Sequence, residues 1–156
     1  MSTEAMAATS QPLATETALQ VLRDGGNALD AAIAASAVLA VVETYSTGIG
    51  GDCFILYHEN DSGRLHALNG SGRSPAAASA ETIRARGFDS MPEYNSLAAT
   101  VPGAVDAWHQ ASHKFGNLDF SALLQPAIHY AEQGYVVSPV IAHNWQKSEQ
   151  LLAQTA

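Results

Sequence analysis

The sequence has a single cysteine, Cys53, which excludes an internal disulfide and any metal site built from several cysteines. Charged residues make up only 14% of the 156 residues, and 7 Lys and Arg stand against 15 Asp and Glu. The formal net charge of −8 argues against a nucleic-acid partner, because a phosphate backbone would repel the chain. Low charge with 47% hydrophobic residues also argues against disorder. We expect one domain, or a piece of a larger one, that buries a core.

The sequence also lacks an apolar stretch long enough to cross a membrane as a helix. Its longest apolar run, residues 28–42, has 15 positions and includes Asp30 and Ser36, whereas a membrane-spanning helix needs about 20. The first residues show no basic segment followed by an apolar one, so they do not resemble a signal peptide. We expect no membrane partner and a cytoplasmic location, or a periplasmic or extracellular one if the N-terminus is truncated.

The glycine-rich turn Gly48-Ile49-Gly50-Gly51 lacks the features of a nucleotide-binding loop. The third glycine of the dinucleotide motif is replaced by Cys53, and a strand rather than a helix is expected to follow. No Lys followed by Ser or Thr stands directly after this glycine turn, as a phosphate-binding loop would require. We expect these glycines to allow a tight entry into a strand or the close approach of another backbone, with lining of a site as the alternative.

Metal and nucleophile motifs are also missing. His109 and His113 lie four residues apart on a predicted helix, but Gln110 stands where a metalloprotease would have its glutamate, and no third ligand is evident. Cys53 has no neighbouring base to lower its pKa, so a buried free thiol is the expectation. We therefore expect no metal and no cofactor.

Helical periodicity, cap residues and glycine stops predict more helices than strands. Asn27 is expected to cap the alanine-rich second helix, Ser10 the first and Ser121 the fifth, and Pro126 is expected to split or kink the fifth. The predicted helices span residues 12–24, 28–42, 82–86, 103–115, 121–133 and 139–152, and the predicted strands span 54–57, 65–68 and 97–101. The class is α+β, and two or three strands are too few for so many helices, so a missing part is expected to supply more.

One cation stands out because of its setting. Arg73 lies between Gly72 and Ser74-Pro75, in a loop that cannot be regular. An arginine on such a loop can bind a carboxylate through two parallel hydrogen bonds. The other interpretation, a solvent-exposed or structurally paired arginine, is slightly favoured by the residues alone.

Several blocks of sequence occur together in an order that resembles the gamma-glutamyltransferase (gamma-glutamyltranspeptidase) family. The most specific is Gly25-Gly26-Asn27-Ala28-Leu29-Asp30-Ala31-Ala32, and the blocks extend over nearly the whole chain. They are Ala8–Ala14, Leu22–Ala32, Gly48–Phe54, Pro75–Ala76, Val101–Gly103, Leu124–Ile128 and Ala131–Tyr135.

The resemblance implies an N-terminal nucleophile hydrolase, a four-layer αββα sandwich of which only the N-terminal part is present. Members are made as one precursor that cuts itself before a threonine, giving a large and a small subunit. The new N-terminal threonine is the nucleophile, and its own amine is the base. None of the threonines in this sequence lies in that cleavage context. Residues 1–156 therefore resemble the N-terminal portion of the large subunit, with no catalytic nucleophile in this chain.

The substrate loop departs from the pattern of typical members. These carry an arginine four residues before the proline of an Ala-Pro pair, where it holds the substrate α-carboxylate. The corresponding position here is Ser71, and the arginine is Arg73, two residues before Pro75. This form, with Gly-Gly-Asp at 50–52, looks more like the divergent acylase and oxamate-hydrolysing branch. The expected substrate-binding residues are Arg73, with Ser71 and Gly72 lining the loop.

The sequence thus predicts part of an enzyme that hydrolyses small amides such as glutathione, or transfers their acyl group, through a threonine acyl-enzyme. Its partner would be the small subunit, or a C-terminal remainder, that carries the threonine. The 156-residue chain alone is expected to be inactive. The alternatives are a non-catalytic truncated structural fragment and a divergent amidohydrolase that acts on another small acidic amide.

Overall fold

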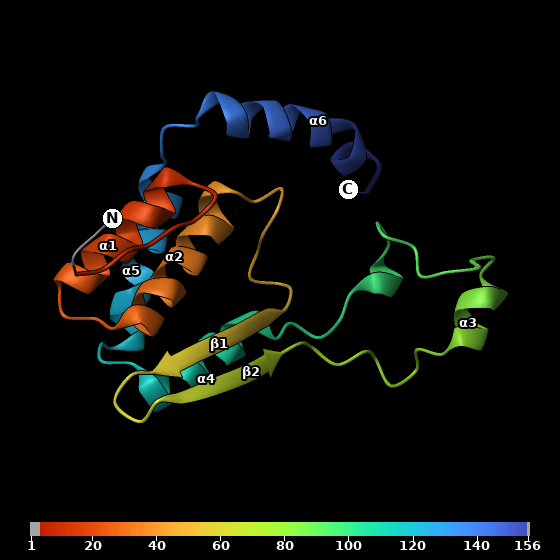
Figure 1. Ribbon diagram of the computed structural model, residues 1–156. Helices are drawn as coiled ribbons and strands as arrows, with labels where there is room; N and C mark the ends of the chain where they lie inside the picture. Colours follow the sequence, from red (N-terminus) through yellow and green to blue (C-terminus); the bar gives the residue numbers. More distant parts are fainter. Residues whose placement is uncertain (1–3, 156) are drawn as a thin grey trace.

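The computed structural model describes residues 4–155 as a helical group packed on one antiparallel hairpin. Figure 1 shows the helices α1, α2 and α5 side by side, the hairpin beneath them and α6 at the opposite end. The elements are α1 (Pro12–Arg23), α2 (Ala28–Val42), β1 (Cys53–Glu59), β2 (Arg64–Gly70), α3 (Ala80–Ala85), the 3-10 helix η1 (Ser96–Ala98), α4 (Ala104–Phe115), α5 (Phe120–Gln133) and α6 (Pro139–Thr155).

Helix α2 is the centre of the fold because it is apolar on every side. Asn27 and Asp30 form a capping box, in which each side chain accepts a hydrogen bond from the backbone of the other residue. Asp30 also accepts from the backbone N–H of Asn117 at 2.9 Å, which ties the start of α2 to the α4–α5 connection. The predicted cap at Asn27 is confirmed.

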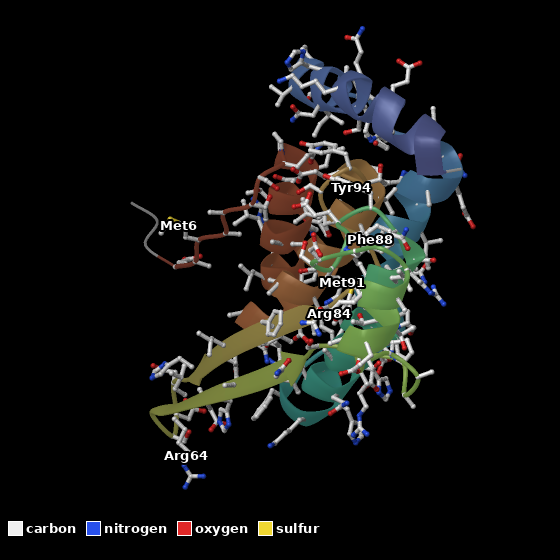
Figure 2. The ribbon with its side chains drawn as sticks, turned by 90° about the vertical axis from the view of Figure 1, so that its right-hand side faces the viewer. Met6, Arg64, Arg84, Phe88, Met91 and Tyr94 are labelled. Carbon is white, nitrogen blue, oxygen red and sulfur yellow. The ribbon has the colours of Figure 1, made fainter. Side chains whose placement is uncertain are left out.

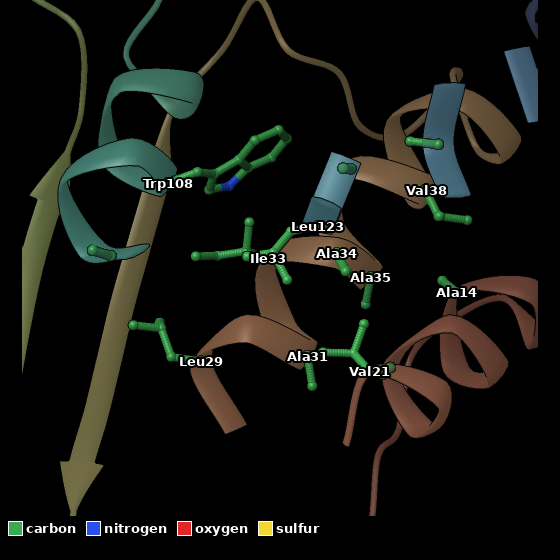
Figure 3. Packing of buried hydrophobic residues seen from close by; sticks show 14 of the residues in the cluster. Ala14, Val21, Leu29, Ala31, Ile33, Ala34, Ala35, Val38, Trp108 and Leu123 are labelled. Carbon is green, nitrogen blue, oxygen red and sulfur yellow. The ribbon is translucent and has the colours of Figure 1, made fainter. Parts of the chain in front are cut away.

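The core lies where α1, α4 and α5 meet α2 (Figure 3). Leu123 of α5 and Ile33 and Val38 of α2 are almost completely buried, and Trp108 of α4 packs over the same cluster. Alanines on α1 and α2 allow these two helices to pack closely, because the methyl side chain is small. Burial of this cluster supplies the main driving force for folding in the chain.

Four local predictions are wrong, and two of them concern helix caps. Helix α1 is capped by Gln11, whose side chain accepts from the backbone N–H groups of Leu13 and Ala14, because the Ser10 hydroxyl donates to Glu43 instead. Helix α5 begins at Phe120 with Asp119 as its N-cap, so the predicted cap at Ser121 lies inside the first turn.

Helix α5 is also continuous through Pro126, so the predicted split is absent. Proline removes one N–H donor from the helix, while Leu123 and Ala127 on either side of it are buried against α2 and keep the two turns aligned. Residues 97–101 do not form the predicted strand. Residues 96–98 form η1, and the one backbone hydrogen bond of Val101, to the Arg73 carbonyl, does not extend into a ladder.

Residues 76–98 form an arm that extends away from the helical group and carries α3 and η1 (Figure 1). Ile83 is buried by the arm itself, while Met91 and Tyr94 are exposed (Figure 2). A hollow of about 360 Å³ lies within the arm, between Ile83, Phe88 and Met91.

The hairpin confirms the strands predicted at 54–57 and 65–68, which pair antiparallel with Phe54 opposite Asn69 and Leu56 opposite Ala67. Helices α2 and α4 lie on one face of it. The other face is open, and Phe54, Leu56 and Leu65 are 70%, 75% and 67% exposed. The chain therefore presents an apolar surface on this face of the hairpin. Within residues 4–155 no helix is both long enough and apolar enough to cross a membrane.

Candidate functional site

Three loops meet at the end of the hairpin where β1 begins and β2 ends. They comprise residues 48–52, 71–75 and 99–103, and we call them the loop cluster. The Gly51 carbonyl accepts from the backbone N–H groups of Gly103 and Ala104, both at 3.0 Å, at the start of α4. The Val101 N–H donates to the Arg73 carbonyl, also at 3.0 Å. Backbone hydrogen bonds thus connect segments more than fifty residues apart in the sequence.

Glycine is required at two positions of the loop cluster because the backbones approach so closely. A Cβ at Gly72 would lie 1.6 Å from the Val101 carbonyl oxygen, and one at Gly103 would lie 2.3 Å from the Gly70 carbonyl oxygen. No side chain fits at such separations without moving the backbone. The loop before Arg73 therefore lies directly against the segment that leads into α4.

The carboxylate of Asp52 joins the first loop to the second. Its Oδ1 accepts from the backbone N–H of Gly72 at 2.8 Å, across twenty residues of sequence. The neighbouring N–H of Ser71 donates to Asn69 Oδ1 at 2.9 Å. Side chains thus hold two consecutive backbone amides immediately before Arg73.

Arg73 itself is exposed, and only its backbone is held in place. Among the residues that the structure describes, no carboxylate lies within 4.0 Å of its guanidinium, since the ion pairs found there are Arg23–Glu16 and His66–Glu59. The interpretation of Arg73 as a structurally paired residue is therefore not supported. A solvated guanidinium on a fixed backbone has all its donors available for an anion.

The glycine turn at 48–51 does not have the packing expected from the sequence. A Cβ at Gly48, Gly50 or Gly51 would meet no atom within 4 Å, and none of the three has a positive φ. Close approach of another backbone thus accounts for none of these three glycines in this chain. The turn does lead into β1, as predicted, and its last carbonyl holds the start of α4.

A buried carboxylate fixes the other end of the same segment. Glu43 follows α2 and is only 7% exposed. It accepts from the hydroxyls of Ser10 and Tyr45, and Tyr45 in turn accepts from Asn144 Nδ2 of α6 at 3.0 Å. Charge-assisted bonds of this kind are stronger than neutral ones. The path from α2 to the loop cluster is therefore anchored at Glu43 and again at Asp52.

The remaining sequence candidates lie elsewhere. Cys53 points to the helical side of the hairpin, and burial raises the pKa of its thiol, which makes it a poor nucleophile at neutral pH. His109 and His113 stack on α4 with ring centroids 6.3 Å apart. Within residues 4–155 no group of three or more His, Cys, Asp or Glu side chains is placed to hold a metal ion.

The structure thus brings Ser71, Gly72 and Arg73 into one fixed loop and adds two residues that sequence reasoning missed. In the sequence Asp52 stands out only as part of a Gly-Gly-Asp pattern, and no motif marks Glu43. An acidic residue directly after a glycine turn is the one signal for Asp52. Its partner, a backbone N–H twenty positions away, leaves no trace in the sequence.

Comparison with known proteins places these residues in a family. Residues 14–156 match the family model described as gamma-glutamyltranspeptidase. The chain is 37% identical over 153 residues to the glutathione hydrolase-like YwrD proenzyme of Bacillus subtilis, covering 98% of this chain and 29% of that protein. It is 38% identical over 150 residues to the oxamate amidohydrolase proenzyme of Klebsiella pneumoniae, covering 92% and 28%.

Solved structures agree with these matches. The crystal structure of cephalosporin acylase from Bacillus halodurans superposes with a TM-score of 0.88 at 45% identity, over 96% of this chain and 28% of that one. The chain thus spans less than a third of the length of the relatives named here.

Proposed function

The chain belongs to the gamma-glutamyltranspeptidase family, and we propose that it is the N-terminal portion of the large subunit of an enzyme that acts on small acidic amides. That enzyme would hydrolyse the amide, or transfer its acyl group, through a threonine acyl-enzyme. The threonine would lie outside this chain, in a small subunit or C-terminal remainder. Two relatives are proenzymes, one glutathione hydrolase-like and one an oxamate amidohydrolase, and both descriptions fit this proposal.

The observation that carries the proposal is the loop at 71–73. Asp52 and Val101 hold its backbone on either side of Arg73, while no carboxylate of the described residues pairs with the guanidinium. Both oxygens of a substrate carboxylate can accept hydrogen bonds from one guanidinium, which fixes the orientation of the substrate as well as balancing its charge. Ser71 and Gly72 would line the loop beside it. In this account the chain supplies substrate binding and the remainder supplies the chemistry.

Arg73 stands two positions from the place that typical members use, which favours a substrate other than a gamma-glutamyl compound. A shorter acidic amide, in which the carboxylate and the amide are close together, suits a displaced cation. Glutathione remains the alternative substrate. The loop geometry is compatible with both, and the ratio of activities on the two distinguishes them.

The four-layer αββα arrangement is part of the same proposal. The helices cover one face of the hairpin, and the open face carries Phe54, Leu56 and Leu65. Strands with apolar residues on both faces are characteristic of sheets that are covered on both sides. A second sheet from the remainder would cover the open face.

The proposal is tested first by the coding DNA beyond the codon for Ala156 and then by assay. A reading frame that continues to a threonine-headed second subunit supports it, while an immediate stop supports the non-catalytic fragment. The purified 156-residue chain should not cleave a chromogenic gamma-glutamyl anilide, or oxamate, because it supplies no nucleophile with an adjacent amine base. Co-expression with the remainder should restore turnover. Turnover by the chain alone that disappears on substitution of one of its own threonines would overturn the assignment.

A further inference from the structure

Asp52 holds the backbone immediately before Arg73. Its carboxylate accepts the Gly72 N–H at 2.8 Å, and Gly72 immediately precedes Arg73. The Val101 N–H holds the Arg73 carbonyl on the other side at 3.0 Å. The Arg73 peptide is therefore held from both directions, while its side chain extends from the fixed segment.

Neighbouring contacts link the position of the Gly72–Arg73 backbone to the position of Asp52. Gly72 lies so close to the Val101 carbonyl that no side chain fits between the two backbones. Gly51, directly before Asp52, accepts from the first amides of α4, so the position of Asp52 is tied to a helix of the core. A shift of Asp52 relative to α4 would thus move the backbone next to Arg73. Displacements of about 1 Å at a binding group can change rates about a hundredfold.

We propose that Asp52 is a positioning residue that sets the substrate selectivity of Arg73 by holding the Gly72 amide. This inference rests on the proposed function of Arg73. It assigns the carboxylate the role of hydrogen-bond acceptor, since an anion facing an acidic substrate would otherwise oppose binding. Positioning and charge repulsion predict opposite results. If Asp52 repelled the substrate, its removal would raise kcat/KM for acidic amides, whereas loss of a positioning contact would lower it.

The first measurement is hydrogen exchange of the Gly72 amide in the 156-residue chain, followed by NMR. Asp52→Ala should speed exchange at Gly72 about 3- to 10-fold, the effect of losing one partly exposed charge-assisted bond. Asp52→Asn keeps an acceptor oxygen and should remain within about twofold of the unmodified chain. The Ser71 amide, held by Asn69, is the internal reference. Asp61→Ala, which removes the same charge at the far turn of the hairpin, is the control.

The second measurement is the ratio of kcat/KM for an acidic amide and its neutral counterpart, in the enzyme assembled with its remainder. Asp52→Ala should lower this ratio about 3- to 10-fold, through KM, and Asp52→Asn should restore most of it. In an Arg73→Ala background, Asp52→Ala should have no further effect on the ratio, because it acts through Arg73.

Three results would overturn the inference. Gly72 exchange that is unchanged in Asp52→Ala would remove the positioning contact. A ratio that rises in both Asp52→Ala and Asp52→Asn would show repulsion instead of positioning. A ratio that is unchanged in Asp52→Ala but falls in Arg73→Ala would separate Asp52 from selectivity. If Arg73→Ala itself leaves the ratio unchanged, the proposed function of Arg73 fails. Exchange at Gly72 then decides alone whether Asp52 positions the loop.

Discussion

The two faces of the β1–β2 hairpin carry similar side chains in opposite surroundings. On the inner face Cys53, Ile55 and Tyr57 are partly buried against the helices. On the outer face Phe54 and Leu56 are largely exposed. A strand that is apolar at every position is expected when both faces are covered, whereas a half-exposed strand alternates with polar residues. Both faces of the hairpin thus carry apolar side chains, and the helices of this chain cover only the inner face.

The largest expected difference in stability between the buried core and the open face of the hairpin is between substitutions of two leucines. Leu123→Ala removes a side chain that is 1% exposed, and Leu56→Ala removes one that is 75% exposed. In the isolated chain the first should lower the free energy of unfolding by about 2–5 kcal/mol through lost burial and a cavity. The second should change it by less than about 0.5 kcal/mol.

Urea unfolding followed by circular dichroism measures both variants. If Leu56→Ala lowered the free energy of unfolding as much as Leu123→Ala, the outer face would already be covered, for instance by self-association, and the contrast between the two faces would be wrong. Assembly with the remainder should make Leu56→Ala destabilising.

A second pair contrasts a closely packed glycine with an open one. Gly72→Ala forces a methyl group onto the Val101 carbonyl oxygen, whereas Gly48→Ala meets no atom within 4 Å. We expect Gly72→Ala to lower stability by about 1–3 kcal/mol, as overpacking does. Gly48→Ala should be neutral or raise stability by up to about 1 kcal/mol, through a less flexible unfolded chain.

Thermal unfolding of the two variants tests this pair. Equal stability of the two would show that the loop cluster is loose. A loss at Gly48 alone would mean that the glycine turn packs against something within the chain.

The smallest expected effect lies at the far, solvent-exposed end of the hairpin. A hydrogen bond from the Ser62 hydroxyl, together with His66, holds the pKa of the exposed Glu59 below its ordinary value. A lowered pKa in the folded state contributes stability at pH above the unfolded value, and this is lost as the pH falls through the folded value. Glu59→Gln should therefore slightly lower stability at neutral pH, leave it unchanged in acid below the folded pKa of Glu59, and so flatten the acid side of the stability curve. A pH series of unfolding midpoints measures this, and an identical acid slope in the variant would contradict it.

The helices and the hairpin could be predicted because their signals are local. The Asn27 cap, the glycine stops and the two strands of the hairpin each depend on neighbouring residues, and the structure confirms them. The errors arose where a distant partner decides the outcome. Ser10 donates to Glu43, thirty-three positions away, so Gln11 takes the cap. Pro126 stays within a helix because the neighbouring turns are buried against α2.

Only part of the candidate site could be predicted from the sequence, because its other contacts also depend on distant partners. Arg73 between a glycine and a Ser-Pro pair is visible in the sequence, and its role in substrate binding remains a prediction. The contact from Asp52 to Gly72 depends on two loops that the hairpin brings together, so it appears only in three dimensions. The separation between Gly72 and Val101 likewise depends on the placement of α4.

The substrate selectivity of Arg73→Ala in the assembled enzyme decides whether Arg73 binds an acidic substrate group. Arg64→Ala, which removes another exposed arginine at the opposite end of the hairpin (Figure 2), is the matched control. We expect Arg73→Ala to lower kcat/KM for an acidic amide about 10- to 150-fold more than for its neutral counterpart. Arg73→Lys should restore little, since a point charge lacks the planar fork, and Arg64→Ala should leave the ratio unchanged. Equal losses on the acidic and the neutral amide in Arg73→Ala would contradict the claim and leave Arg73 as a structural residue.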